Sequence, residues 1–89
     1  MVWTIELTDD AARQLGKMGR VEARRIREYL RDRVAALENP RLLGRPLTGN
    51  KHGHLWRYRV GDYRILCELR DRTLVVLVVD IGHRSEIYK

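Results

Sequence analysis

The sequence lacks the features that stabilise small secreted proteins or anchor membrane proteins. Cys67 is its only cysteine, which excludes an intramolecular disulfide framework and suits a reducing compartment. The longest apolar run, TLVVLVVDI, has the length of a strand, well below the ~20 residues of a membrane-spanning helix. The first residues, MVWTIELTDD, become acidic early and contain no hydrophobic run of signal-peptide length. These absences predict a soluble cytoplasmic protein without membrane association, and the chain length of 89 predicts a single domain over residues 1–89.

Basic residues dominate the charge of the chain. Eighteen Lys and Arg residues against twelve Asp and Glu residues give a formal net charge of +6. Such an excess favours a polyanion or an acidic protein as the partner, although it does not specify a fold. One predicted helix carries Arg20, Arg24, Arg25, Arg27, Arg31 and Arg33. These arginines form either an ordinary solvated helix face or a surface for RNA phosphates, and both interpretations remain open.

Hydrophobic periodicity divides the chain into elements in the order β-α-α-β-β-β. Residues 2–8 alternate between apolar and polar side chains, which indicates a half-buried strand. Thr8 before two aspartates predicts the start of a short helix. A longer helix follows over residues 21–38, until Asn39 and Pro40 end it. The expected fold is α+β: a small, antiparallel-rich, four-stranded sheet with an αα-hairpin packed on one face.

The segment PRLLGRPLTGNKHGHL is predicted to be a loop, because two prolines and three glycines interrupt any period. Within it His52 and His54 form an H-x-H pair. No cysteine, aspartate or further histidine lies nearby at metal-ligand spacing, so two ligands do not make a site. We therefore expect no metal and no other cofactor.

The stretch HLWRYRVGDYRILCEL predicts a β-hairpin with a defined register. Gly61 and Asp62 form a two-residue hairpin loop between alternating runs. This loop places Arg59 opposite Arg64 and gathers both with Arg57 on one face of the sheet. The other face is an apolar wall formed by Trp56, Tyr58, Val60, Tyr63, Ile65, Cys67 and Leu69. After a short turn at Asp71 and Arg72, TLVVLVVDI returns as a strand that is covered on both sides.

The three clustered arginines have two explanations. Like charges that face each other across two strands destabilise the pair. The cluster therefore favours an anion as its partner, and planar guanidinium groups match phosphate oxygens bidentately. Neutralisation by Glu68 or Glu86 is the alternative.

A family resemblance rests on three segments, ENPRLLGRPL, LWRYRVGDYRILCEL and VVDIGHRSEIYK. Together they resemble the RelE family of bacterial toxins, within the RelE/ParE superfamily, and the likeness extends over essentially the whole chain. The resemblance implies a type II toxin that is a metal-independent mRNA endoribonuclease (mRNA interferase) and inhibits translation. It implies cleavage of mRNA in the ribosomal A site, by attack of the ribose 2′-OH on the adjacent phosphate. The implied partners are a cognate antitoxin, RelB-like or other, the ribosome-bound mRNA, and operator DNA through the antitoxin complex.

The resemblance also implies which residues are catalytic. It assigns Arg57 and Arg59 to two basic positions on the first hairpin strand and Arg64 to the arginine after the Gly-x-Tyr turn. Arg84 and Tyr88 match the basic and tyrosine positions of the closing segment. These arginines can supply charge but not proton transfer, because guanidinium does not deprotonate in proteins. Here the sequence departs from the family, whose members often have lysine at the two hairpin positions.

Proton transfer is therefore expected from His83 or Tyr88. Nearby cations would lower the pKa of a tyrosine from its usual ~10, whereas histidine near ~6.5 is already in the working range. The cationic surroundings favour Tyr88. The alternatives are that His83 only ends a strand and that Tyr88 only packs at the terminus.

Two other functions share this fold. A ParE-like member would poison DNA gyrase as a binding protein without nuclease chemistry, and the ending HRSEIYK argues against it. A catalytically weak basic module would act only with its antitoxin, and arginine in place of lysine at Arg57 and Arg59 leaves this open.

The pattern also predicts a core and a docking surface. The residues expected to be buried are Trp3, Ile5, Leu15, Ile26, Leu30, Val34, Tyr58, Ile65, Cys67, Val76 and Val78. An acidic antitoxin segment is expected to fold over the positive concavity and its apolar rim.

Overall fold

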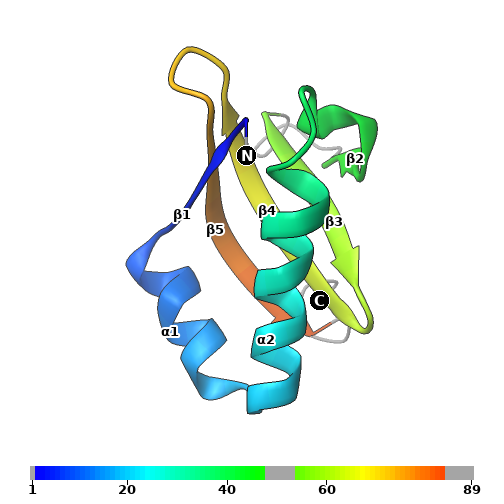
Figure 1. The fold of residues 1–89 in the computed structure, drawn as a ribbon. Helices are drawn as coiled ribbons and strands as arrows, with labels where there is room; N and C mark the ends of the chain where they lie inside the picture. The colour runs from blue at the N-terminus through cyan, green and yellow to red at the C-terminus, as the bar shows by residue number, and fades with distance from the viewer. Residues whose placement is uncertain (1, 48–53, 84–89) are drawn as a thin grey trace.

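The structure, a computed structural model, describes residues 2–47 and 54–83 (Figure 1). Its elements are β1 (Thr4–Leu7), α1 (Asp9–Lys17), α2 (Arg20–Tyr29), a π-helical turn (Leu30–Val34), a 3-10 turn (Pro40–Leu42), β2 (Arg45–Pro46), β3 (Leu55–Val60), β4 (Tyr63–Arg70) and β5 (Val75–His83). The order confirms the predicted β-α-α-β-β-β pattern and adds the short strand β2. No helix within these described ranges has the length and apolarity that crossing a membrane requires.

The strands form one sheet in the order β1-β5-β4-β3-β2. Only β1 pairs in parallel, with β5, and the other pairings are antiparallel. The sheet therefore has five strands, and the predicted four-stranded sheet and uninterrupted loop were wrong at Arg45 and Pro46. These residues pair with Arg57 and Trp56. Proline is compatible with this position because β2 lies at the edge of the sheet, where one side of the strand needs no donor.

Both helices begin where the sequence predicts, and the second ends earlier than expected. Thr8 caps α1 by accepting a hydrogen bond from the Ala11 amide at 3.1 Å. The second predicted helix, over residues 21–38, was too long: α2 ends at Tyr29 and continues only as the π-helical turn. Asn39 instead caps the following 3-10 turn, where its side chain accepts from the Arg41 amide at 3.0 Å.

The two helices lie against one face of the sheet and cover its apolar wall (Figure 1). Of the residues predicted to be buried, all but one are less than a tenth exposed. The exception, Ile5, is half-buried and packs against the core. The apolar wall of the hairpin is thus the face that receives the helices, so Arg57, Arg59 and Arg64 project from the opposite face.

β5 contains an irregularity that the sequence does not reveal. The register with β4 shifts between Leu66 and Cys67, which pair with Asp80 and Val78 and leave Val79 as an extra residue. Gln14 of α1 binds next to this bulge: its Nε2 donates to Asp80 Oδ1 at 2.6 Å, and its Oε1 accepts from the Ile81 amide at 2.8 Å. The turn before β5 spans residues 71–74, two more than predicted.

Candidate functional site

The β3–β4 hairpin has the predicted register. Arg59 pairs with Arg64, and Arg57 with Leu66. Gly61 has φ +59° and is followed by a residue with negative φ, the pattern of a type II′ turn, whose twist matches the flanking strands. The two-residue loop therefore fixes which arginines face each other.

A fourth arginine joins this cluster through β2. Arg45 pairs directly with Arg57, so it projects from the same face of the sheet. The arginines line a pocket of about 350 Å³, which we call the arginine pocket. Its lining residues are Leu42, Leu43, Gly44, Arg45, Arg57, Tyr58, Arg59 and Arg64. Sequence reasoning missed Arg45, because a two-residue strand has no periodicity to detect.

Arg64 is the innermost cation of this pocket. Its residue is only 7% exposed, and it is the only charged residue that is buried among those the structure describes. It lies between Arg59 on β3 and Gly82 on β5, and Gly82 has no side chain to cover it. A charge held in a buried position acts through a lower effective dielectric, which strengthens its attraction for an anion.

One edge of the arginine pocket is formed by the segment over residues 40–44, which we call the rim. Side-chain hydrogen bonds fix this rim to β3. The Tyr58 hydroxyl donates to the Pro40 carbonyl at 2.8 Å, and Trp56 Nε1 donates to the Leu43 carbonyl at 2.6 Å. Burial raises the pKa of the Tyr58 hydroxyl, so it remains a donor at neutral pH. Gly44 has φ +71° and lies so close to β3 that a Cβ there would meet the Arg57 carbonyl oxygen. Only glycine fits this approach.

A bidentate ion pair ties the same rim to the far end of β4. Arg41 donates from both terminal nitrogens to the Asp71 carboxylate, each at 2.9 Å. These hydrogen bonds lower the pKa of Asp71 and raise that of Arg41. The rim is therefore anchored at three places: the β4–β5 turn, Tyr58 and Trp56.

His83 lies on the other face of the sheet. It pairs with Tyr63, and their rings meet edge to face with centroids 5.6 Å apart. It lines a separate pocket together with Gln14, Lys17 and Met18, on the side of α1. The structure therefore brings Arg57, Arg59 and Arg64 together but not His83. The expectation that His83 would border the arginine cluster was wrong, because Gly82 and not His83 pairs with Arg64.

The remaining predicted site residues are only partly covered by the structure. Arg84, Tyr88, Glu86 and His52 lie outside the described residues. Glu68, one candidate for neutralising the cluster, forms an ion pair with Arg70 at 2.9 Å. Among the residues described, no group of three or more His, Cys, Asp or Glu side chains is arranged to hold a metal ion.

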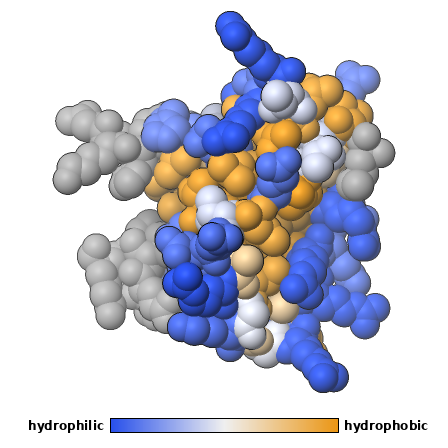
Figure 2. All heavy atoms as spheres, turned by 90° about the vertical axis from the view of Figure 1, so that its left-hand side faces the viewer, coloured by the Kyte–Doolittle hydropathy of each residue, from blue (hydrophilic) through white to orange (hydrophobic). Residues whose placement is uncertain are grey.

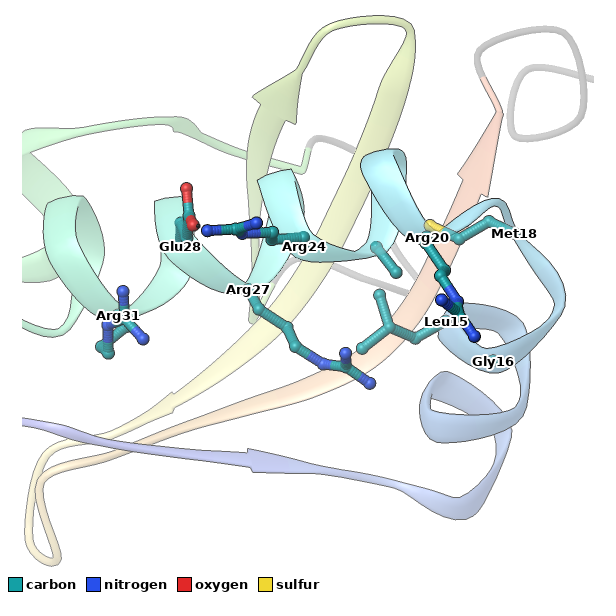
Figure 3. A pocket seen from close by; sticks show the side chains of 9 residues that line it. Leu15, Gly16, Met18, Arg20, Arg24, Arg27, Glu28 and Arg31 are labelled. Atoms are coloured by element: carbon teal, nitrogen blue, oxygen red, sulfur yellow. Dashed lines mark hydrogen bonds and ion pairs between the residues drawn. The ribbon is translucent and has the colours of Figure 1, made fainter.

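A second basic feature lies between the helices (Figure 3). This helix groove, of about 750 Å³, is lined by Leu15, Gly16, Met18, Arg20, Ala23, Arg24, Arg27, Glu28 and Arg31. Arg24 pairs with Glu28 and Arg31 with Asp32, whereas no described residue forms an ion pair with Arg20 or Arg27. Four of the six arginines singled out on the second predicted helix therefore border a groove, whereas Arg25 and Arg33 do not line it.

An apolar pocket of about 320 Å³ continues the helix groove toward β1. It shares Leu15, Arg27 and Arg31 with the groove and adds side chains of Ile5 and Leu30. Figure 2, which views the side that carries β1 and α1, shows an apolar strip bordered by hydrophilic side chains. The protein thus has two basic surfaces, one on each face of the sheet.

This fold is that of a class of toxins from type II toxin–antitoxin systems. Residues 5–88 match the family described as the ParE toxin of the type II toxin–antitoxin system parDE, and the chain belongs to that family. It is also similar to the mRNA interferase toxin RelE of Escherichia coli (strain K12). The two sequences are 29% identical over 91 residues, which cover 99% of this chain and 92% of the relative. The resemblance to the RelE/ParE superfamily is therefore confirmed.

Solved structures of RelE toxins share the fold. A toxin–antitoxin complex from Mycobacterium tuberculosis superposes with a TM-score of 0.83 at 23% identity, covering 97% of this chain and 95% of the other. A mutant of Escherichia coli RelE in the free state gives a TM-score of 0.75 at 23% identity, covering 99% and 92%. The archaeal RelE–RelB complex from Pyrococcus horikoshii gives 0.72 at 23% identity, covering 97% and 99%.

Proposed function

We propose that the protein is an mRNA interferase: a metal-independent endoribonuclease that acts in the cytoplasm on ribosome-bound mRNA and so inhibits translation. The observation that carries this proposal is the arginine pocket, where three arginines gather around the buried Arg64 on one face of the sheet. The similarity to RelE, whose name states this activity, supports the same conclusion.

The arginine pocket suits the charge that develops during RNA cleavage. Attack of the ribose 2′-oxygen forms a bond to phosphorus and breaks the bond to the 5′-oxygen, through a dianionic phosphorane. Arg57, Arg59 and Arg64 bind and stabilise this charge as preorganised cations, and the family resemblance assigns the same role to Arg84. The products are a 2′,3′-cyclic phosphate and a 5′-hydroxyl, so one proton leaves the 2′-OH and one reaches the leaving oxygen.

Tyr88 is the proposed proton carrier. The separation of His83 from the arginine pocket by the sheet supports this choice over histidine. Arginine cannot exchange the proton, so a titratable group from outside the cluster is required. A tyrosine beside several cations has a lowered pKa and can act as base and then as acid.

Single-turnover cleavage on ribosomes programmed with one mRNA tests these roles. Arg64→Ala should slow cleavage by about 10²–10³ at every pH, the scale of a lost transition-state donor. Tyr88→Phe should flatten one limb of the pH–rate profile, and His83→Gln should leave both limbs unchanged. Arg72→Ala, in the exposed β4–β5 turn, is the matched control. Unchanged cleavage by Arg64→Ala would overturn the proposal for the pocket, and an unchanged profile in Tyr88→Phe would overturn that for the tyrosine.

The family description favours one second candidate, a ParE-like toxin that poisons DNA gyrase. Primer extension on mRNA from cells expressing the protein separates the two. Codon-phased cuts within translated regions support the interferase, whereas gyrase–DNA breaks without such cuts support the gyrase poison. Neither signal from the toxin alone would point to a catalytically weak module that works only with its antitoxin.

A cognate antitoxin is the proposed protein partner, since the similar structures include complexes of RelE with RelB. The helix groove suits an acidic amphipathic segment, because arginines border it and an apolar pocket continues it. The arginine pocket, expected from sequence to be the docking surface, is then left to RNA or to a second part of the antitoxin. Operator DNA would be reached through the antitoxin.

Association kinetics with the purified antitoxin test this docking site. The double change Arg20→Gln and Arg27→Gln should slow association and reduce its dependence on salt, because two steering charges are lost. Arg13→Gln, an exposed arginine of α1 that pairs with Asp10 and lies outside the groove, is the control. Association rates equal to the control would move the antitoxin to another surface.

A further inference from the structure

Leu42 is an exposed apolar residue that lines the arginine pocket, and folding of the protein does not explain its position there. Its residue is 74% exposed, so it adds little to the core. It also lines the arginine pocket, next to the half-buried Leu43. Single exposed apolar side chains are common on protein surfaces, so exposure alone would mean little. Its position beside four arginines and its fixed backbone set Leu42 apart.

The backbone around Leu42 is held from both sides. On the N-terminal side, Asn39 caps the 3-10 turn, and the Tyr58 hydroxyl binds the Pro40 carbonyl. On the C-terminal side, Trp56 binds the Leu43 carbonyl at 2.6 Å. The backbone that carries this apolar side chain therefore has a defined place relative to the arginines before any ligand arrives. Such preorganisation lowers the entropic penalty of binding.

A nucleotide matches this combination of groups. Its phosphate needs cations, and its base offers a flat, largely apolar face. A pocket of about 350 Å³ lies near the lower end of the ~300–1,000 Å³ range of small-ligand sites, a size suited to one nucleotide. Resting on the proposed mRNA interferase function, we propose that Leu42 contacts a nucleobase of the mRNA beside the phosphate held by the arginines. Leu42 is then a substrate-binding residue that contributes to nucleotide selectivity.

A double-mutant cycle between protein and RNA tests this contact. The reaction is single-turnover cleavage of short mRNAs on ribosomes with an empty A site. The mRNAs are intact or carry one abasic nucleotide at each A-site position in turn. Leu42→Ala should raise the half-saturating toxin concentration on intact mRNA about fivefold to tenfold, for the loss of a few apolar carbons, and leave the maximal rate unchanged. On the mRNA that lacks the contacted base, Leu42→Ala should have no further effect.

Two controls keep the result specific. Leu42→Met should restore binding, since it keeps an apolar side chain of similar volume. Val21→Ala, which alters a residue of α2 that is also 74% exposed, should behave as the unchanged protein. Thermal unfolding should be the same for all variants, because position 42 is on the surface.

The outcomes separate this inference from the proposed function. The base contact would be overturned if the unchanged protein cleaves mRNA and Leu42→Ala raises the half-saturating toxin concentration equally on intact and on every abasic mRNA. The base contact would also be overturned if Leu42→Ala leaves cleavage unaffected and lowers the affinity for the antitoxin. That result would assign Leu42 to binding of the protein partner. Absence of cleavage by the unchanged protein would instead overturn the mRNA interferase itself.

Discussion

Replacing Arg59 by Gln should stabilise the protein while it impairs cleavage. Arg59 lies directly opposite Arg64, and side chains in such pairs have Cβ atoms about 4.5–5.5 Å apart. Like charges there are unfavourable by up to about 1 kcal/mol, and the burial of Arg64 places this pair in the upper part of that range. The free energy of unfolding should therefore rise by about 0.5–1 kcal/mol. For a domain of this size, the melting temperature should rise by about 2–8 °C.

Urea unfolding at low and high salt measures whether the gain is electrostatic. Between about 0.1 M and about 1 M salt the Debye length falls from about 10 Å to about 3 Å, so the advantage of Arg59→Gln should shrink. Cleavage on ribosomes should fall about 10²-fold, because the same charge stabilises the phosphorane. Arg72→Gln should change neither quantity, since Arg72 lies in an exposed turn.

The reasoning would be refuted by a loss of stability in Arg59→Gln at low salt, or by a gain that salt does not reduce. Either result would mean that the two guanidinium groups do not repel each other in the free protein. The argument that the pocket is built for an anion would then lose its energetic basis.

Three further predictions concern the scaffold. Gly44→Ala should lower the free energy of unfolding by about 3 kcal/mol, because the left-handed backbone and the contact with β3 both oppose a Cβ. Gly61→Ala should lower it by only about 1–2 kcal/mol, because there only the left-handed backbone opposes a Cβ. Equal losses in thermal unfolding would contradict the steric argument. The hydrogen bonds from Arg41 lower the pKa of Asp71, so the pair stabilises the fold at neutral pH and this contribution is lost as the pH falls below about 4. The stability difference between the unchanged protein and Asp71→Asn should therefore shrink in acid, as urea unfolding across pH would show. Burial raises the pKa of the Cys67 thiol, so thiol reagents at pH ~8 should modify it only at the rate of unfolding; rapid modification of the native protein would argue against its burial.

The hairpin could be predicted residue by residue because two signals agree. A two-residue loop at Gly61 and Asp62 permits one register, and the alternation of Trp56, Tyr58 and Val60 requires the same one. Turn chemistry and burial both act over a few residues here, so the sequence contains the information locally.

The position of His83 could not be predicted in the same way. It depends on how β5 lies against β4, and the bulge after Val78 shifts that register by one residue. A one-residue shift exchanges the two faces of a strand. The bulge is held by Gln14, which comes from a helix far away in the sequence and shows no motif. Arg45 was missed for a related reason: its pairing follows from the close approach of Gly44 to β3, a tertiary contact.

The parallel pairing of the first strand with the last has a consequence for synthesis of the chain. The Thr8 hydroxyl reaches the Val79 carbonyl, 71 residues later, and β1 has no other strand partner among the described residues. Closing so long a loop comes late in folding, because its entropy is lost before the contacts form. Arg64 likewise lacks its β5 neighbour until the last strand is made. A nascent or truncated chain that ends before β5 should therefore remain open and harmless to the ribosome that makes it, and circular dichroism of such a fragment should show no folded sheet. The connectivity therefore delays completion of the sheet, and with it of the arginine face, until β5 has been made.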